Sequence, residues 1–204
     1  METTEFILPD DLKECIAFHG HLCPGLVYGY RVAKAAMNLL KLHRSEDEEV
    51  VAVCENDSCA VDALQVLLGT TAGKGNLDIK NYGKNAYTIL NRSTQKAYRF
   101  SRLKQYRYTG PEKEEFGRLE EFFSSDTGTD ADKWRFKLLK SADLLSKPLD
   151  AIFSVHEVEF VEPPYAPLAR SKSCARCGEM TMSTRMVVTD NRTHICIPCS
   201  ETPE

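Results

Sequence analysis

The sequence lacks any apolar run close to the ~20 residues that a helix needs to cross a bilayer. Its first residues, METTEFILPDD, also lack the basic start and the apolar stretch of a secretory signal. We therefore expect a cytoplasmic protein that does not insert into a membrane. The chain has no cysteine run of the ferredoxin type, so the sequence gives no sign of an iron–sulfur cluster. It also has no internal repeat or low-complexity tract.

Acidic side chains are absent from residues 79–111, although this segment carries eight basic ones. The whole chain has a net charge of −4, so the other residues together carry −12. The segment suits an anionic partner or a dimer interface. The simplest interpretation is an exposed hairpin whose charges pair with the acidic residues 112–121. We do not expect nucleic acid as a partner, because residues 170–204 are nearly balanced, with five basic and four acidic side chains.

Eight cysteines stand out in this chain of 204 residues, and in a reducing compartment clustered cysteines more often bind metal than form disulfides. Four have the spacing C-x2-C-x18-C-x2-C: Cys174, Cys177, Cys196 and Cys199. Each CxxC pair offers two thiolates to one tetrahedral ion, and the chain between the pairs must fold back. Residues 181–188 favour a strand and 193–196 a returning one. We predict a zinc-ribbon-like hairpin around one structural zinc ion. A treble clef is less favoured, because only five residues follow Cys199.

A second group of candidate ligands lies in the first 60 residues: His19, His21, Cys23 and Cys59. The first three alternate, so they would share one side of an extended segment. Two imidazoles and a thiolate are a normal ligand set for zinc or another transition metal. Cys23 and Cys59 each stand at a predicted helix start, which stabilises a thiolate. We therefore take Cys59, Cys23 and His21 as candidate catalytic residues. Alternatively, the cysteines are small buried hydrophobes and the histidines bond to backbone.

The predicted elements follow a mixed order, which indicates an α+β core. Helices are predicted over residues 10–18, 24–42, 59–68, 112–124 and 131–146, and strands over residues 50–54, 86–92, 97–108 and 149–161. Pro163, Pro164 and Pro167 indicate a linker. We therefore divide the chain into a core domain (1–162), a linker (163–169) and a four-cysteine zinc-binding domain (170–204).

The glycine-rich loop 69–76 invites comparison with a phosphate-binding loop. It is one residue short, follows a predicted helix instead of a strand, and has Gly75 where the motif requires Ser or Thr after Lys74. We therefore expect no ATP or GTP site, although the loop could form a backbone nest in which Lys74 faces an anion.

The chain resembles a known family in three sequence blocks: FHGHLCPGLVYGYR (18–31), CAVDALQ (59–65) and TAGKGNL (71–77). In sequence, order and separation these blocks resemble the FmdE family of formylmethanofuran dehydrogenase subunits, and the resemblance covers roughly residues 10–160. Some family members have a C-terminal zinc finger, and the four-cysteine segment looks like that extension. The resemblance implies a metal-associated pocket built from His19, His21, Cys23 and Cys59. It also implies four residues that line the pocket: Asp62, Gln65, Lys74 and Asn76.

The resemblance further implies an accessory or redox-related subunit of an oxidoreductase, one that associates with a molybdenum or tungsten dehydrogenase complex, and we expect a homodimer. Two alternatives remain open. The chain could be a stand-alone metal- or thiol-dependent enzyme that uses Cys23 or Cys59 with His21. It could also be a nucleic-acid-binding regulator that uses the zinc ribbon and the basic segment.

Overall fold

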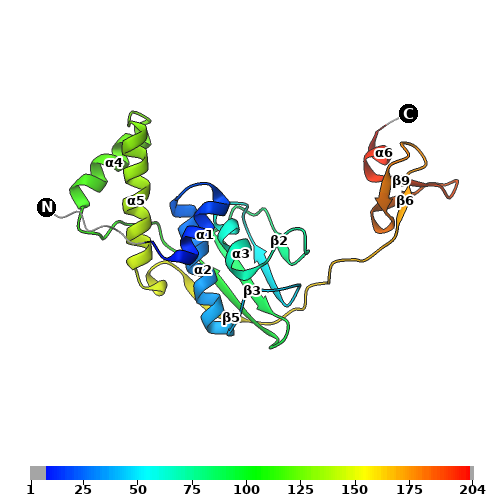
Figure 1. Ribbon diagram of the computed structural model, residues 1–204, viewed down its shortest axis with the longest axis horizontal. Helices are drawn as coiled ribbons and strands as arrows, with labels where there is room; N and C mark the ends of the chain where they lie inside the picture. The colour runs from blue at the N-terminus through cyan, green and yellow to red at the C-terminus, as the bar shows by residue number, and fades with distance from the viewer. Residues whose placement is uncertain (1–7, 203–204) are drawn as a thin grey trace. The chain divides into compact units, whose positions relative to one another are not determined.

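The computed structural model describes residues 8–202. The chain divides into two compact units, the first ending at Pro164 and the second beginning at Tyr165 (Figure 1). The first unit mixes helices with a five-stranded sheet, which confirms the predicted α+β class. None of the helices in the described part of the chain is long and apolar enough to cross a membrane.

The helices of the first unit, in chain order, are α1 (Asp10–His19), α2 (Pro24–Leu40), α3 (Ala60–Leu68), α4 (Lys113–Ser125) and α5 (Asp130–Ser146), with a short 3-10 turn η1 (Leu149–Ala151). Its strands are β1 (Val50–Cys54), β2 (Leu77–Ile79), β3 (Ala86–Asn91), β4 (Lys96–Ser101) and β5 (Ser154–Val158). The local signals are the expected ones. Pro24 occupies the first turn of α2, Gly69 ends α3 at φ 69°, and Thr129 forms a capping box with Asp132 at the start of α5.

The sheet has the strand order β2-β1-β3-β4-β5. Strands β1 and β2 run parallel, and the other neighbouring pairs run antiparallel. The predicted hairpin is present as β3 and β4, with Ala86 opposite Ser101 and Asn91 opposite Lys96. Its second strand ends at Ser101 rather than at residue 108, and beyond Ser101 the chain leaves the sheet. The last predicted strand is also shorter, since residues 149–151 form η1.

Side chains that alternate along the central strands face opposite sides of the sheet and belong to two different apolar clusters, as the two-residue period of a strand requires. Ala52, Ile89 and Phe100 face the main core, which they share with α1, α2 and α3. Leu90 and Ala97 belong to a smaller cluster with Val51, Val158 and Phe160. The three N-terminal helices therefore cover one face of the sheet and bring their ends together above it.

Two glycines allow α2 and α3 to pack closely. A Cβ atom at Gly29 would lie 2.0 Å from the carbonyl oxygen of Ala60, which is impossible without a shift of the backbone. A Cβ atom at Gly25 would lie 3.1 Å from Cβ of Cys59. These glycines are four residues apart and share one face of α2. The start of α3 can therefore rest against the first two turns of α2.

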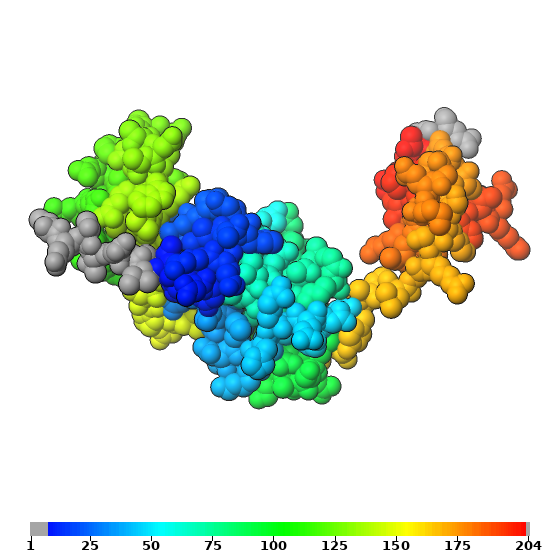
Figure 2. Space-filling view, viewed as in Figure 1, coloured from blue at the N-terminus to red at the C-terminus, as the bar shows by residue number. Residues whose placement is uncertain are grey.

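Helices α4 and α5 form an antiparallel pair with its own small core of Phe116, Leu119, Phe136 and Leu139. Arg31 of α2 joins this pair to the rest of the unit. Its guanidinium donates to the carbonyl oxygens of Leu144, Leu145 and Lys147, at 2.5, 3.0 and 2.7 Å. A basic side chain on the last carbonyls of a helix stabilises the helix end. In Figure 2 the yellow-green atoms of α5 border the blue atoms of the first helices, and α5 packs against α2.

The second unit consists of two short hairpins and one short helix. Its elements are β6 (Ser171–Ser173), β7 (Met180–Met182), a 3-10 turn η2 (Ser183–Arg185), β8 (Met186–Val188), β9 (His194–Cys196) and α6 (Ile197–Glu201). The predicted return strand is present, since β8 pairs with β9. The hairpin of β6 and β7 was not predicted. The expectation of too little room for a helix was wrong, because α6 begins between the last two cysteines of the chain.

Candidate metal centres

His19, His21 and Cys23 meet at the junction of α1 and α2. His19 is the last residue of α1, and Cys23 is the N-cap of α2. One ligand atom from each residue lies within 4.8 Å of the other two. The three residues do not form the single extended segment that their alternation predicts. Gly20 ends α1 in the left-handed conformation at φ 94°, which turns the chain and folds the three side chains together. We call these three residues the N-terminal cluster.

Asp62 of α3 fixes the orientation of one imidazole in this cluster. Its Oδ2 lies 2.6 Å from Nδ1 of His19, and Gln65 donates to its other oxygen at 3.1 Å. An ionised carboxylate only accepts hydrogen bonds, so Nδ1 of His19 carries the proton. Nε2 of His19 is then free to act as a ligand and lies 3.7 Å from Sγ of Cys23. In a tetrahedral zinc site, a bound nitrogen and sulfur are about 3.5 Å apart, so this pair fits a shared ion.

Cys59 lies beside the cluster at the start of α3, where it is the N-cap residue. The Cβ position at Gly25 would be 3.5 Å from Sγ of Cys59 and 3.7 Å from Sγ of Cys23. Both thiols therefore point toward the same turn of α2. A cavity of about 380 Å³ lies beside Cys59, and its lining includes His19, Cys59, Asp62 and Gln65 but not Cys23. Four of the residues predicted from the sequence thus share one hollow.

The charge states around the cluster follow from burial. Burial raises the pKa of the Cys23 thiol, and the neighbouring Cys59 adds to this, while a hydrogen bond from the backbone N–H of Leu26 opposes it. The N–H groups at the helix start stabilise the Cys23 thiolate as the sequence predicts, but burial outweighs their effect. Burial, His19 and Lys137 together lower the pKa of His21. His21 is accordingly neutral at pH 7, which is the form that binds a metal ion.

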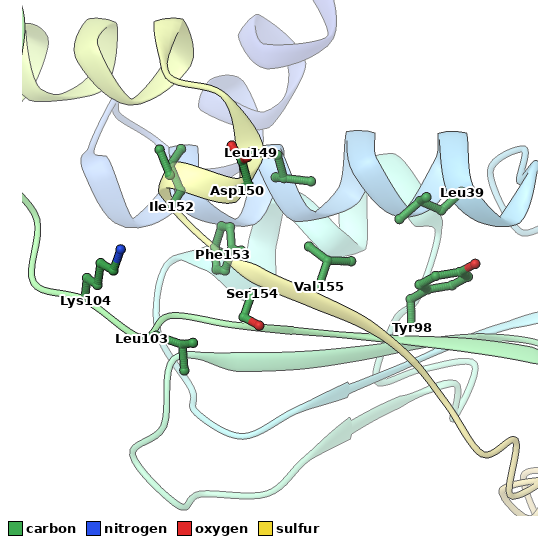
Figure 3. Close-up of a pocket in the computed structure, with 11 residues that line it drawn as sticks. Leu39, Tyr98, Leu103, Lys104, Leu149, Asp150, Ile152, Phe153, Ser154 and Val155 are labelled. Atoms are coloured by element: carbon green, nitrogen blue, oxygen red, sulfur yellow. The ribbon is translucent and has the colours of Figure 1, made fainter.

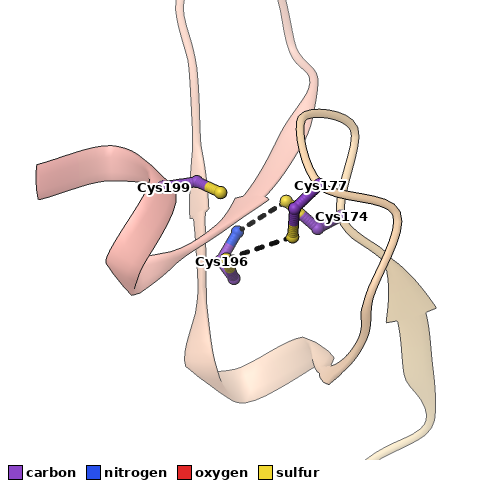
Figure 4. A group of neighbouring side chains, drawn as sticks. All are labelled: Cys174, Cys177, Cys196 and Cys199. Atoms are coloured by element: carbon purple, nitrogen blue, oxygen red, sulfur yellow. Dashed lines mark hydrogen bonds between the residues drawn. The ribbon is translucent and has the colours of Figure 1, made fainter. Parts of the chain in front are cut away.

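The four C-terminal cysteines converge on one point in the second unit, as Figure 4 shows: Cys174, Cys177, Cys196 and Cys199. Their sulfur atoms all lie within 4.8 Å of one another, and those of Cys177 and Cys196 are 3.8 Å apart. A tetrahedron with Zn–S bonds of about 2.3 Å has edges of about 3.8 Å. The donor set and its spacing therefore fit a zinc ion. We call this group the four-cysteine site.

Backbone N–H groups prepare the four-cysteine site for negative charge. Those of Cys177, Cys196 and Arg176 lower the pKa of the Cys174 thiol to about 6, and the bond from Cys196 measures 3.3 Å. The neighbouring Cys196 and burial have the opposite effect on Cys199 and raise its pKa to about 12. Four thiolates at this spacing repel one another, so all four ionise only around a cation. The four-cysteine site can bind a metal ion such as zinc.

Two other residues assigned from the sequence lie elsewhere. Lys74 donates to the carbonyl oxygen of Ser45 at 2.9 Å. Asn76 is fully buried and donates to the carbonyl oxygen of Val50 at 2.8 Å, while its own Oδ1 accepts from the N–H of Thr71. Both side chains hold the loop after α3 against the segment before β1. The structure does not bring them to the cavity beside Cys59.

Two residues that shape this region were missed from the sequence. Gly29 permits the close crossing of α2 and α3, and nothing in its local pattern separates it from an ordinary helical glycine. Lys137 of α5 is near enough to His21 to lower its pKa, although it lies 116 residues further along the chain. Only the packing of α5 beside the N-terminal helices places its charge there.

These features define a metal-binding protein in which an α+β domain with a His–Cys cluster is joined to a small zinc-ribbon-like unit. The family model described as "FmdE, Molybdenum formylmethanofuran dehydrogenase operon" matches residues 18–154. The chain therefore belongs to the FmdE family, as the sequence blocks predicted.

The proteins that are similar to this chain include one curated relative and one solved structure. The first is a protein of Archaeoglobus fulgidus named "Probable S-adenosyl-L-methionine-binding protein", which is 30% identical over 205 residues. The match covers 90% of this chain but 50% of that protein, so the chain spans about half of its length. The second is the crystal structure of a tungsten formylmethanofuran dehydrogenase FmdE-like protein from Syntrophus aciditrophicus, with a TM-score of 0.56 and 21% identity. The match covers 95% of this chain and 92% of that one, and it supports the fold alone.

Proposed function

We propose that the N-terminal cluster binds a transition-metal ion, zinc being the first candidate, and that the four-cysteine site holds a structural zinc ion. The observation that carries the first part is the alignment of Asp62, His19 and Cys23. A carboxylate that holds one nitrogen of a histidine while the other nitrogen faces a thiol is the usual arrangement behind a protein metal ligand. His21 adds a second imidazole on the exposed side of the cluster.

The cavity beside the N-terminal cluster supports a metal site with an open coordination position, at which a reaction can occur, over a closed structural site. A bound ion with an open position would supply a Lewis acid for a water or substrate oxygen. Cys59 and Gln65 line the cavity, where they would contact and orient a substrate. Burial of Cys23 favours its neutral thiol, so a neighbouring cation is what would keep it ionised as a ligand.

At the level of biological role, we propose an accessory subunit related to FmdE that associates with a molybdenum or tungsten dehydrogenase and forms a homodimer. The description of the family supports the association, because it names the formylmethanofuran dehydrogenase operon. Large apolar side chains on the outside of the first unit support a protein interface, for example Phe18 (59% exposed) and Trp134 (60% exposed).

A second candidate is a thiol-dependent enzyme in which Cys59 is the nucleophile. Cys59 is partly exposed to the 380 Å³ cavity, where His19 and Asp62 are also found. A cysteine beside a histidine that is oriented by a carboxylate is a known nucleophile arrangement. The two candidates make different demands on Cys59, since only the second needs its thiol to react.

Metal analysis of purified protein tests the proposal. We expect two ions per wild-type chain, loss of one in His21→Ala, and loss of the other in Cys174→Ser. His43→Ala is the matched control, because His43 is exposed and outside both sites, and it should retain both ions. A wild-type chain that keeps a single ion, unchanged in His21→Ala, would contradict the N-terminal metal site. Retention of both ions in Cys59→Ala would show that Cys59 is not a metal ligand, which favours the second candidate, whereas loss of the N-terminal ion would count against it.

A further inference from the structure

A second, larger cavity of about 740 Å³ lies in the first unit, between α2, the segment that follows β4 and the end of α5. Four basic side chains line it: Arg102, Lys104, Arg107 and Lys147. Among the described residues of its lining there is no Asp or Glu. Three of these basic residues belong to segment 79–111, which has no Asp or Glu. The positive charge of this segment has no role in the N-terminal cluster or in the four-cysteine site.

Most of this positive charge is unpaired. Lys147 forms an ion pair with Asp143 at 2.9 Å, and Asp143 also accepts hydrogen bonds from Tyr106 and Thr109. Within residues 8–202, Arg102, Lys104 and Arg107 form no ion pair with any carboxylate. The hairpin interpretation from the sequence, in which these charges pair with helix α4, therefore does not hold for these three.

Tyr28 provides an independent sign of a ligand. The residue is 8% exposed and lines the cavity, yet its hydroxyl forms no hydrogen bond with any residue in the described part of the chain. The guanidinium of Arg102 lies 4.3 Å from the centre of its ring. Tyr28 Oη is not among the fully buried polar atoms that lack a partner, so the hydroxyl is open to the cavity. Water or a ligand oxygen in the cavity can serve as its hydrogen-bond partner.

An apolar hollow of about 710 Å³ lies next to the basic cavity, and Lys104, Ala151 and Ile152 line both. Figure 3 shows its lining, in which apolar side chains predominate: Leu39, Leu103, Leu149, Ile152, Phe153 and Val155. Asp150 is its one carboxylate among the described residues, and it is not part of the basic cavity. A basic cavity next to an apolar one suits a ligand with an anionic head and an apolar body.

We propose that these neighbouring cavities together bind a phosphorylated small molecule with an apolar body. Its phosphate would lie among Arg102, Lys104, Arg107 and the hydroxyl of Tyr28, and its apolar part in the hollow beside Leu103. Phosphate matches this chamber better than a single carboxylate, because it carries up to two charges and three oxygens, while guanidinium groups bind such oxygens in pairs. The site is separate from the N-terminal cluster and does not depend on its metal.

Isothermal titration calorimetry of the full chain with inorganic phosphate, octyl phosphate below its micelle concentration, and octanoate tests the proposal. We expect octyl phosphate to bind at least about tenfold tighter than phosphate, because each buried methylene adds to the affinity. Lys104→Gln should weaken both phosphates about tenfold, and Tyr28→Phe several-fold. Leu103→Ala should weaken octyl phosphate and leave inorganic phosphate unchanged.

Lys96→Gln is the matched control, since Lys96 is an exposed lysine of the same basic segment and lies outside both cavities. It should change each affinity less than about twofold. Equal losses in Lys96→Gln and Lys104→Gln would show diffuse attraction and overturn the proposal. Tighter binding of octanoate than of octyl phosphate would overturn the phosphate assignment. Binding to an RNA oligonucleotide that octyl phosphate does not displace would overturn the small-molecule ligand.

Discussion

The N-terminal cluster and the four-cysteine site differ in what holds their side chains in place. The N-terminal cluster is built on helices that belong to a large apolar core, and Gly25 and Gly29 fix the approach of those helices. In the described part of the second unit, by contrast, the only buried apolar side chains are those of Cys174 and Cys196. Two of the four ligands of the four-cysteine site are therefore themselves the core of that unit.

This contrast gives the two ions different physical roles. About 40 residues with almost no apolar core cannot fold alone, so ion binding and folding are one process in the second unit. In the first unit the protein orders the ligands before any ion arrives. An ion there adds stability only according to its affinity and concentration. The following predictions test this difference, beginning with the largest effect.

Cys174→Ser, or treatment with a strong chelator, should unfold the second unit completely. The free energy of zinc binding to small structural sites is about 10–16 kcal/mol, which exceeds what the short hairpins can contribute. Limited proteolysis of the full chain should then remove the second unit and leave a resistant fragment that ends near residue 164. The fluorescence of Trp134, the single tryptophan, should show an unchanged unfolding midpoint for the first unit. A protease-resistant second unit without metal would break the comparison.

Gly29→Ala should strongly destabilise the first unit. The added methyl group would lie 2.0 Å from the carbonyl oxygen of Ala60, so α2 and α3 must separate. We expect a loss of about 3 kcal/mol or more in the free energy of unfolding, followed through Trp134 during urea denaturation. The zinc of the four-cysteine site should remain bound.

Gly117→Ala in α4 is the control for this experiment, because a Cβ atom there would meet nothing within 4 Å. Alanine is the better helix former, so this variant should be about 0.5–1 kcal/mol more stable than the wild type. If both glycine variants behaved alike, the helix crossing would not be what orders the N-terminal cluster.

The sequence alone predicted the ligands better than their environment. The C-x2-C-x18-C-x2-C spacing defines the four-cysteine site because two such pairs gather around one ion wherever the chain takes them. His19, His21 and Cys23 were recognised as residues, but their alternation suggested an extended segment. The left-handed turn at Gly20 overrides that period, and sequence spacing gives no account of it.

Local sequence patterns could not predict contacts between segments that are distant in the chain. The glycine-rich loop suggested that Lys74 could face an anion, yet its ammonium group donates to the backbone of Ser45. The basic stretch was expected to continue as a strand to residue 108, but it leaves the sheet after Ser101 because Asp143 of α5 binds Tyr106 and Thr109. A buried carboxylate thus anchors the segment that was expected to be a strand, and this segment lines the basic cavity.

Asp143→Asn should cost the first unit about 2 kcal/mol at pH 7, because it breaks a buried ion pair with Lys147 and weakens the bonds from Tyr106 and Thr109. Burial opposes ionisation of Asp143, but these hydrogen bonds outweigh it and hold its pKa below the ordinary value of 3.8. A lowered pKa stabilises the fold above about pH 4, and this contribution is lost as the pH falls through the folded-state pKa.

The difference between Asp143→Asn and the wild type in urea denaturation should therefore shrink as the pH is lowered toward about 3. Asp126→Asn is the control, since Asp126 forms an exposed pair with Lys133 and its loss should not measurably change stability. A pH-independent difference would assign the effect to packing instead of charge.

Asp62→Asn should have the smallest effect on stability and a specific effect on metal binding. Asp62 is the counterpart of Asp143 in the same unit, but it is partly exposed and its main partner is His19 of the N-terminal cluster. We expect a change of less than about 0.5 kcal/mol in the free energy of unfolding. Affinity for zinc at the N-terminal cluster should fall about 10–100-fold, because an amide can hold His19 in the wrong tautomer and makes its Nε2 less basic.

Competition with a chromophoric chelator measures this affinity, and the zinc of the four-cysteine site in the same chain serves as an internal reference that should not change. Asp57→Asn provides the matched control. Asp57 lines the same cavity and carries the same charge, but it forms no hydrogen bond with His19. If the two variants lost equal affinity, Asp62 would act only through its charge. A loss of zinc affinity in Asp62→Asn but not in Asp57→Asn would show that the fold of the first unit orients its metal ligands. The second unit cannot orient its ligands in this way without its ion.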